Sequence, residues 1–135
     1  MKRYALDSNI ISYLLKKDRL VAERIRKAIS FGNEVAILPI AYYEIKRGLI
    51  AVNASSKMRL FMKFCVQNKV GDINLSVLDA AADIHASLRR IGRVTEDADI
   101  LIAAFCVTHG YTLVTHNTRH FEDIDGLHVE DWVEN

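Results

Sequence analysis

Three acidic residues and one amide lie where short apolar runs of the sequence end or the segments after them begin. Asp7 directly follows the run YAL, and Glu44 lies five residues beyond the only proline, in AYYEIKRG. Asp99 lies in EDADILIAA, and Asn117 follows the β-rich run YTLVT. Because sites in open α/β sheets form at the carboxyl ends of strands, we expect all four side chains to reach one edge of a sheet.

The residue types at these positions favour a divalent metal ion. Asp99 has apolar neighbours on a helix with little polar surface, so its charge needs a partner or a cation. Carboxylates held together repel one another, and one of them would take up a proton unless a cation were present. Oxygen ligands suit Mg²⁺, or Mn²⁺ as a substitute, better than zinc. Such an ion can polarise a phosphodiester and activate a water molecule.

Each of these residues also has an ordinary interpretation when it is taken alone. Asp7 could cap a helix, and Glu44 could be a solvated helix residue. Asp99 could complement a helix dipole, and Asn117 could be a turn residue. The metal-site hypothesis therefore depends on the convergence of the whole set.

The elements that must position these residues alternate between short apolar runs and longer periodic segments. Apolar runs predict strands at 4–6, 34–38 and 111–115, a weaker strand at 71–75 and an edge strand at 127–129. Helical spacing and punctuating residues predict helices over 10–15, 18–29, 40–51, 55–66, 76–91 and 95–107. The last helix is apolar on every side, which indicates a buried helix, with a central strand as the alternative. This alternation predicts an α/β fold in which helices cover both faces of a parallel sheet.

Capping residues indicate where three of these helices begin. Ser8 or Asn9 could cap the first helix, which would leave Asp7 free for another role. Ser76 opens an SVLD segment that resembles a capping box, with Asp in place of the usual Glu or Gln. Thr95 is the expected start of the buried helix.

Length, composition and charge restrict the class of protein. The chain has 135 residues, of which 50% are hydrophobic, and we expect a single domain over residues 1–135. A net charge of +1 does not indicate nucleic-acid binding by the chain as a whole, although a local basic patch is compatible with it. The two cysteines lie in apolar runs, which predicts buried thiols in a reducing, cytoplasmic setting. No apolar stretch reaches the length of about 18 residues that a membrane span needs, and no signal-peptide pattern is present.

Four segments of the chain resemble the PIN domain, and most of all the VapC-type toxins of toxin–antitoxin pairs. These segments are LDSN at 6–9, the Glu44-x-x-x-Gly48 spacing, DILIAAF at 99–105 and TLVTHNTRHFEDIDGLHVEDW at 112–132. The resemblance implies a three-layer α/β/α fold with a short parallel sheet. It also implies a Mg²⁺-dependent endoribonuclease whose partner is a VapB-like antitoxin.

The resemblance also implies roles for individual residues. Asp7, Glu44 and Asp99 match the three acids of the family, and Asn117 matches a fourth position that is often Asp. Asp7 and Asp99 would hold Mg²⁺ directly or through water, while Glu44 and Asn117 would orient water molecules. Ser8 replaces the usual Thr, and its hydroxyl can still form a hydrogen bond.

One spare acid and four basic residues lie near these motifs. Asp97 could be a peripheral metal ligand, but two residues along a helix from Asp99 it points elsewhere. Single-stranded or looped RNA is the expected substrate, because its bases and backbone can enter a cleft at the rim of the sheet. Each nearby basic residue could contact phosphate or could be an ordinary solvated charge. These residues are Lys46, Arg47, Arg93 and Arg119.

Histidine chemistry is a competing hypothesis. His116 and His120 have the i, i+4 spacing of helical zinc ligands, but their segment is typical of a loop and lacks an intervening Glu or a nearby cysteine. His85, His109 and His128 have the character of structural or surface residues.

Two further alternatives concern the activity itself. The chain could be a catalytically weak PIN-like module that binds a DNA-binding partner, although the presence of all three acids argues against this. Nucleotide binding is not expected, because no Gly-rich phosphate loop of the GxxxxGK[ST] type occurs.

Residues 10–50 carry more Ile, Leu and Tyr than one small core face needs. Some of these side chains could line a groove for an antitoxin helix or a face of a homodimer. The simpler interpretation is that they pack the core.

Overall fold

The computed structural model describes residues 1–133, which form a five-stranded parallel sheet with helices on both sides. The strands are β1 (Arg3–Leu6), β2 (Glu34–Ile37), β3 (Lys69–Val70), β4 (Thr112–Val114) and β5 (Val129–Glu130). The helices are α1 (Ser8–Leu15), α2 (Arg19–Ser30), α3 (Pro39–Ala51), α4 (Ser55–Gln67), α5 (Leu75–Arg90), α6 (Asp97–His109) and a 3₁₀ turn, η1 (Thr118–Phe121).

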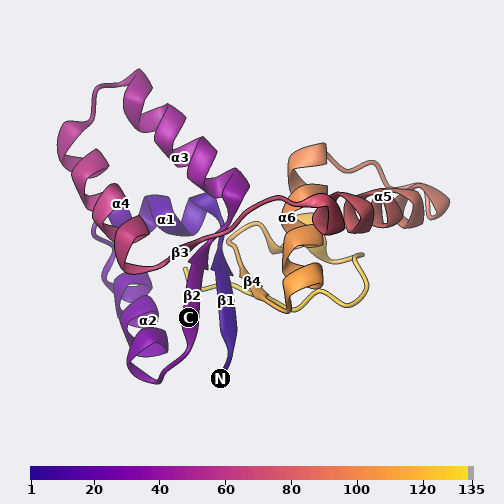
Figure 1. Ribbon diagram of the computed structural model, residues 1–135, viewed down its shortest axis with the longest axis horizontal. Coiled ribbons are helices and arrows are strands. Elements are labelled where there is room, and N and C mark those ends of the chain that lie inside the picture. Colours follow the sequence, from indigo (N-terminus) through magenta and orange to yellow (C-terminus); the bar gives the residue numbers. More distant parts are fainter. Residues whose placement is uncertain (134–135) are drawn as a thin grey trace.

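The order of strands in the sheet is β3-β2-β1-β4-β5, and each neighbouring pair is parallel. Leu6, at the end of β1, pairs with Ile37 on one side and with Val114 on the other. In Figure 1 the chain starts at the lower end of β1, and α1 and α3 begin at the upper edge of the sheet. Helices α1, α2 and α4 lie to one side of the sheet, and α5 and α6 lie to the other. The predicted three-layer α/β/α fold is therefore confirmed.

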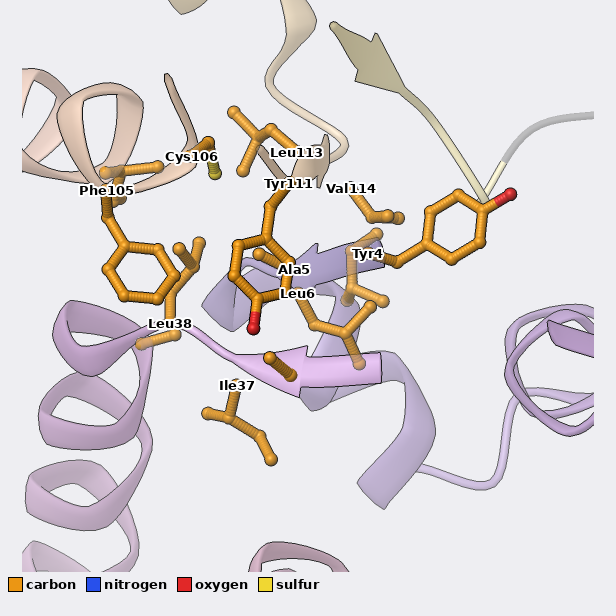
Figure 2. Packing of buried hydrophobic residues seen from close by; sticks show 14 of the residues in the cluster. Tyr4, Ala5, Leu6, Ile37, Leu38, Phe105, Cys106, Tyr111, Leu113 and Val114 are labelled. Atoms are coloured by element: carbon orange, nitrogen blue, oxygen red, sulfur yellow. The ribbon is translucent and has the colours of Figure 1, made fainter. Parts of the chain in front are cut away.

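The core includes buried side chains of the sheet, of α6, and of helices α1 and α2. Leu6, Ile37 and Leu113 are fully buried on three adjacent strands. Helix α6 buries side chains around most of its circumference, which explains its uniformly apolar sequence and rules out a central strand there. Its Phe105 stacks on Tyr111 at a centroid distance of 5.4 Å, and Figure 2 shows both rings beside the strand residues.

The starts of α5 and α6 differ from the expected caps, and α1 takes the alternative cap, Asp7, in place of Ser8 or Asn9. The N-cap of α1 is Asp7 itself, with extended φ and ψ of −78° and 163°, so Ser8 lies inside the helix. Helix α5 is capped by Asn74, whose Oδ1 accepts from the backbone N–H of Val77 at 3.1 Å, and Ser76 is not the cap. Helix α6 begins after Glu96 rather than at Thr95. In each case the cap is the residue with extended φ and ψ directly before the first helical residue. Which residue has that conformation depends on how the preceding segment enters the helix.

The weaker strands are also displaced from their predicted positions. β3 ends at Val70 rather than spanning 71–75, and residues 71–74 run without regular structure into α5. β5 covers Val129–Glu130 instead of 127–129, and it aligns where the backbone N–H of Thr115 donates to the Glu130 carbonyl at 3.0 Å. Both strands have two residues, so their hydrophobic signal is too short to fix their register.

Within residues 1–133, no helix combines the length and the apolar character that crossing a bilayer would require. Cys65 and Cys106 are buried and unpaired, as their apolar surroundings predict.

Candidate functional site

Asp7 occupies the carboxyl end of the central strand. Its backbone N–H donates to the Val114 carbonyl at 3.0 Å, which fixes the residue at the edge of the sheet between β1 and β4. Its Oδ1 accepts from the Ser8 backbone N–H at 2.7 Å, and its Oδ2 accepts from the Thr115 hydroxyl at 2.8 Å. Asp7 is only 5% exposed. The residue therefore caps α1 with one oxygen and joins a buried polar cluster with the other.

Thr115 is the centre of that cluster and was not predicted from the sequence. It is fully buried immediately after β4, and its hydroxyl oxygen accepts from the Asn117 backbone N–H at 3.1 Å and from the Asn9 side chain at 3.3 Å. Asn9 Oδ1 in turn accepts from the His116 backbone N–H at 3.0 Å. These bonds tie the start of α1 to the segment after β4. A polar residue that ends an apolar strand was the signal that could have revealed Thr115.

The electrostatics of Asp7 show that three acids are close enough to interact. Burial is the main cause that raises the pKa of Asp7 above its usual range, and the negative charges of Glu44 and Asp99 raise it further. Hydrogen bonds from Thr115 and Ser8 act in the opposite direction and lower this pKa without cancelling the effect of burial. The structure thus brings together one acid from the end of β1, one from α3 and one from α6.

Asp99 lies in the first turns of α6, and its side chain is 21% exposed. Its Oδ2 lies 3.0 Å from His120 Nδ1, a contact that links α6 to η1. Asp97 is exposed at the start of the helix and takes no part in the cluster around Asp7. Asn117 is also exposed, and its backbone N–H, rather than its side-chain amide, donates to the Thr115 hydroxyl.

The acids do not form a closed metal cage. Within residues 1–133, no group of three or more His, Cys, Asp or Glu side chains is arranged to hold a metal ion by itself. A cation at this edge would therefore be held partly through water or through amide and hydroxyl oxygens. Mg²⁺ commonly binds proteins in this way, because it keeps several of its water ligands.

The two histidines of the predicted zinc alternative contact different carboxylates. His116 Nδ1 lies 2.9 Å from Asp131 Oδ2, and its ring packs edge-on against Tyr13 at 6.2 Å between centroids. His120 contacts Asp99 instead. The segment between these histidines includes η1 rather than an irregular loop.

The four basic residues near the motifs differ in whether their charged groups already have a partner in the structure. Lys46 Nζ donates to the Tyr42 hydroxyl at 3.0 Å. Arg93 forms ion pairs with Glu122 and Asp123 and donates to the Arg119 carbonyl. The side chains of Arg47 and Arg119 are exposed. Among the described residues Arg47 rests on the ring of Tyr43, while the Arg119 guanidinium has neither an ion pair nor a hydrogen bond.

A groove of about 560 Å³ runs between α1, α2 and α4, away from the acids. Its floor includes Leu14, Leu15, Leu60 and Phe64, and Leu60 is 47% exposed. Basic side chains stand along the same groove: Lys17, Arg19, Arg26 and Lys63.

Comparison with known proteins identifies the family. The PIN domain model matches residues 4–127. The tRNA(fMet)-specific endonuclease VapC of Shigella flexneri is 30% identical, over 98% of this chain and 99% of that protein. Ribonuclease VapC1 of Haemophilus influenzae is 27% identical, over 96% of this chain and 97% of that protein.

Solved structures give the same result. The crystal structure of DNA-bound VapBC from Salmonella typhimurium matches with a TM-score of 0.86 and 27% identity, over 98% of this chain and 99% of the matched chain. VapBC-1 from nontypeable Haemophilus influenzae matches with a TM-score of 0.84 and 26% identity, over 98% and 99% of the two chains. The fold and these matches agree, and this chain belongs to the PIN domain family, in its VapC branch.

Proposed function

We propose that this chain is an endoribonuclease, the toxin of a VapBC-like toxin–antitoxin pair, and that it hydrolyses RNA with the help of Mg²⁺ or Mn²⁺. The observation that carries the proposal is the buried carboxylate of Asp7, whose ionised form is disfavoured by burial and by Glu44 and Asp99. Names of relatives such as the Shigella endonuclease support the same activity.

The donor set fits a divalent cation that prefers oxygen. A dication placed among the three acids would reverse the like-charge repulsion that raises the pKa of Asp7. Carboxylate, amide and hydroxyl oxygens are the donors present around Asp7, which suits Mg²⁺ and Mn²⁺. Because the acids form no closed cage within residues 1–133, part of the coordination would come from water.

Each residue of the site then has a defined task. Asp7 and Asp99 hold the cation, and the bonds from Ser8 N–H and the Thr115 hydroxyl keep the Asp7 carboxylate in place. Glu44 and Asn117 orient water at the rim, and Asp97 stays peripheral. When bound, the cation supplies Lewis-acid chemistry, which makes water a better nucleophile and stabilises charge on the phosphate.

The RNA strand would cross the rim next to exposed basic side chains. Arg119 is the best-placed of them, because it follows Asn117 by two residues and its charge is not used by another described residue. The Arg93 guanidinium already forms ion pairs with Glu122 and Asp123. We therefore expect Arg119→Ala to weaken RNA binding more than Arg93→Ala, with Arg47 and Lys46 making smaller contributions.

The groove between α1, α2 and α4 would receive the antitoxin. An amphipathic helix could place its apolar side on Leu14, Leu15 and Phe64 and its acidic flank near Lys17 and Arg19. VapBC complexes among the structural relatives support a VapB-like partner. We also propose that residues 1–135 form one domain, that the chain forms a homodimer, and that it acts in the cytoplasm.

RNA cleavage by purified full-length chain tests this function. Wild type, Asp7→Asn and Asp99→Asn are compared in Mg²⁺, with Asp97→Asn as the matched control for loss of one exposed negative charge. We expect both site variants to lose at least about 100-fold in rate, since a cation that activates water is central to such hydrolysis. Folded site variants that cleave as fast as the control would refute the mechanism. A wild type that binds partner but cleaves no RNA would favour the alternative, a binding module.

A further inference from the structure

The Thr115 hydroxyl lies at the junction of three hydrogen bonds, and its single hydrogen can serve only one of them. Its oxygen accepts from the Asn117 backbone N–H at 3.1 Å, and it lies 3.3 Å from Asn9 Nδ2 and 2.8 Å from Asp7 Oδ2. A backbone N–H can only donate, so the direction of the Asn117 bond is fixed. The direction of the other two bonds depends on which way round the Asn9 amide lies.

The backbone of His116 fixes the orientation of the Asn9 amide. The His116 N–H donates to Asn9 Oδ1 at 3.0 Å, and because an N–H cannot accept, the amide oxygen must face it. The amide nitrogen therefore faces Thr115 and donates to its hydroxyl oxygen. Since Asn9 and Asn117 donate to both lone pairs of that oxygen, the hydroxyl hydrogen is left for Asp7 Oδ2.

The two oxygens of the Asp7 carboxylate are thus held by different parts of the chain. Oδ1 accepts from the Ser8 N–H at 2.7 Å, a bond that belongs to the backbone of α1. Oδ2 accepts from the Thr115 hydroxyl, whose direction depends on Asn9. Thr115 is fully buried and Asp7 is 5% exposed, so water has little access to compete for these bonds.

We propose that Asn9 is a positioning residue for the Asp7 carboxylate, and that it acts through the Thr115 hydroxyl rather than by contact with the cation. The inference rests on the proposed function in one respect, namely that Asp7 holds a divalent cation. Each Asp7 oxygen keeps a second lone pair beside the bond it accepts, so a carboxylate fixed in this way can still bind an ion. Residues that orient a metal ligand change the affinity for the metal without touching it.

A double-mutant cycle on Mg²⁺ binding by the full-length chain tests this coupling. Calorimetric titration compares Asn9→Ala, Thr115→Val and the double variant. We expect Asn9→Ala to weaken Mg²⁺ binding by about 10-fold and Thr115→Val to weaken it by about 10- to 100-fold. The double variant should bind no more weakly than Thr115→Val alone, because the hydroxyl through which Asn9 acts is already missing.

Two further variants separate this role from a general loss of structure. Thr115→Ser keeps the hydroxyl, so Asn9→Ala should weaken Mg²⁺ binding in that background as much as it does in the wild type. Asn74→Ala is the matched control, because it removes another asparagine whose side chain accepts from a backbone N–H, at the start of α5. The control should bind Mg²⁺ as tightly as the wild type.

Amide hydrogen exchange in the metal-free protein follows the bonds themselves. Asn9→Ala removes the acceptor of the His116 N–H, so this amide should exchange faster than in the wild type. Thr115→Val leaves that acceptor in place and should change the exchange of the His116 N–H much less. An equal rate in wild type and Asn9→Ala would overturn the inference, and this measurement does not depend on the metal.

Two results of the titrations would overturn the inference and leave the proposed function intact. One is an Asn9→Ala variant that binds Mg²⁺ as tightly as the wild type, and the other is losses that add in the double variant. A wild type that binds neither Mg²⁺ nor Mn²⁺ would overturn the inference and the metal-dependent function together. Circular dichroism verifies the fold of each variant, and if Thr115→Val does not fold, Asn9→Ala and the exchange rates decide the question.

Discussion

Replacing Asp7 by asparagine should leave the metal-free protein at least as stable as the wild type, although the residue is buried at the centre of the site. The wild-type carboxylate accepts from Ser8 N–H at 2.7 Å and from the Thr115 hydroxyl at 2.8 Å. Burial and the charges of Glu44 and Asp99 nevertheless raise its pKa, so its ionised form is unfavourable in the folded chain. An amide of nearly the same shape removes that charge.

Two terms decide the size of the effect. Asparagine has one acceptor oxygen and an NH₂ group in place of the second oxygen, so one of the two hydrogen bonds is lost, at a cost of about 0.5–1.5 kcal/mol. Burial and the charges of Glu44 and Asp99, which raise the pKa of Asp7, make its ionised form costly in the folded chain at neutral pH, and the substitution removes this cost. We expect this gain to offset the lost bond.

The same pKa sets the pH dependence. Since folding raises the pKa of Asp7, the folded state binds the proton more tightly than the unfolded state does. The stability contribution of Asp7 is greatest below pH 3.8 and is lost as the pH rises through the folded pKa. The advantage of Asp7→Asn should therefore be small in acid, grow across this window and stay constant at neutral pH.

Urea unfolding in EDTA, measured for wild type and variant between pH 3.5 and 7.5, tests these expectations. In Mg²⁺ the order should reverse, because an ion present at about 100 times its Kd stabilises the wild type by about 2.7 kcal/mol. For a chain of this size that corresponds to about 10 °C in Tm. A variant that is more than about 1 kcal/mol less stable than wild type in EDTA at pH 7, or a difference that does not change with pH, would refute the reasoning.

Three further substitutions test other parts of the structure. Gly71→Ala would place a Cβ 2.6 Å from Cε2 of the buried Phe105 ring, so we expect a loss of about 1–3 kcal/mol in thermal or urea unfolding. Tyr111→Phe removes a phenol that donates to Glu34 and whose pKa burial raises to about 12. Wild type should lose stability as the pH rises from 10 toward 12, the variant should lose less, and equal slopes would contradict the assignment. Thr115→Val leaves Asp7 without its hydroxyl donor and should cost about 1–3 kcal/mol, which the same unfolding assay measures.

The convergence of the acids was predictable because it follows from topology. Parallel strands put their carboxyl ends at one edge, and Asp7 directly follows such a strand. The proline at the start of α3 fixes the helix that carries Glu44. The uniformly apolar sequence around Asp99 indicates a buried helix, and α6 confirms it. These signals are local in sequence and required no knowledge of tertiary contacts.

The features that escaped prediction depend on contacts between distant segments. Thr115 reaches Asp7 across 108 residues, and His120 reaches Asp99 across 21. No local pattern encodes either pairing. The capping role of Asp7 depends on its extended backbone at the end of β1, and Asn9, which is equally suited to a cap, instead bonds to Thr115. A residue type that suits several roles takes the one that the tertiary structure provides.

The central claim is that the acids at the carboxyl edge of the sheet hold a divalent cation on which RNA hydrolysis depends. The most direct measurement is cleavage of single-stranded RNA by the full-length chain after removal of metals with EDTA, followed by addition of Mg²⁺ or Mn²⁺. The account predicts no cleavage by the stripped protein and restored cleavage with either ion in the wild type, but not in Asp7→Asn or Asp99→Asn. Cleavage that continues in EDTA, or that either ion restores equally in the folded variants, would contradict it.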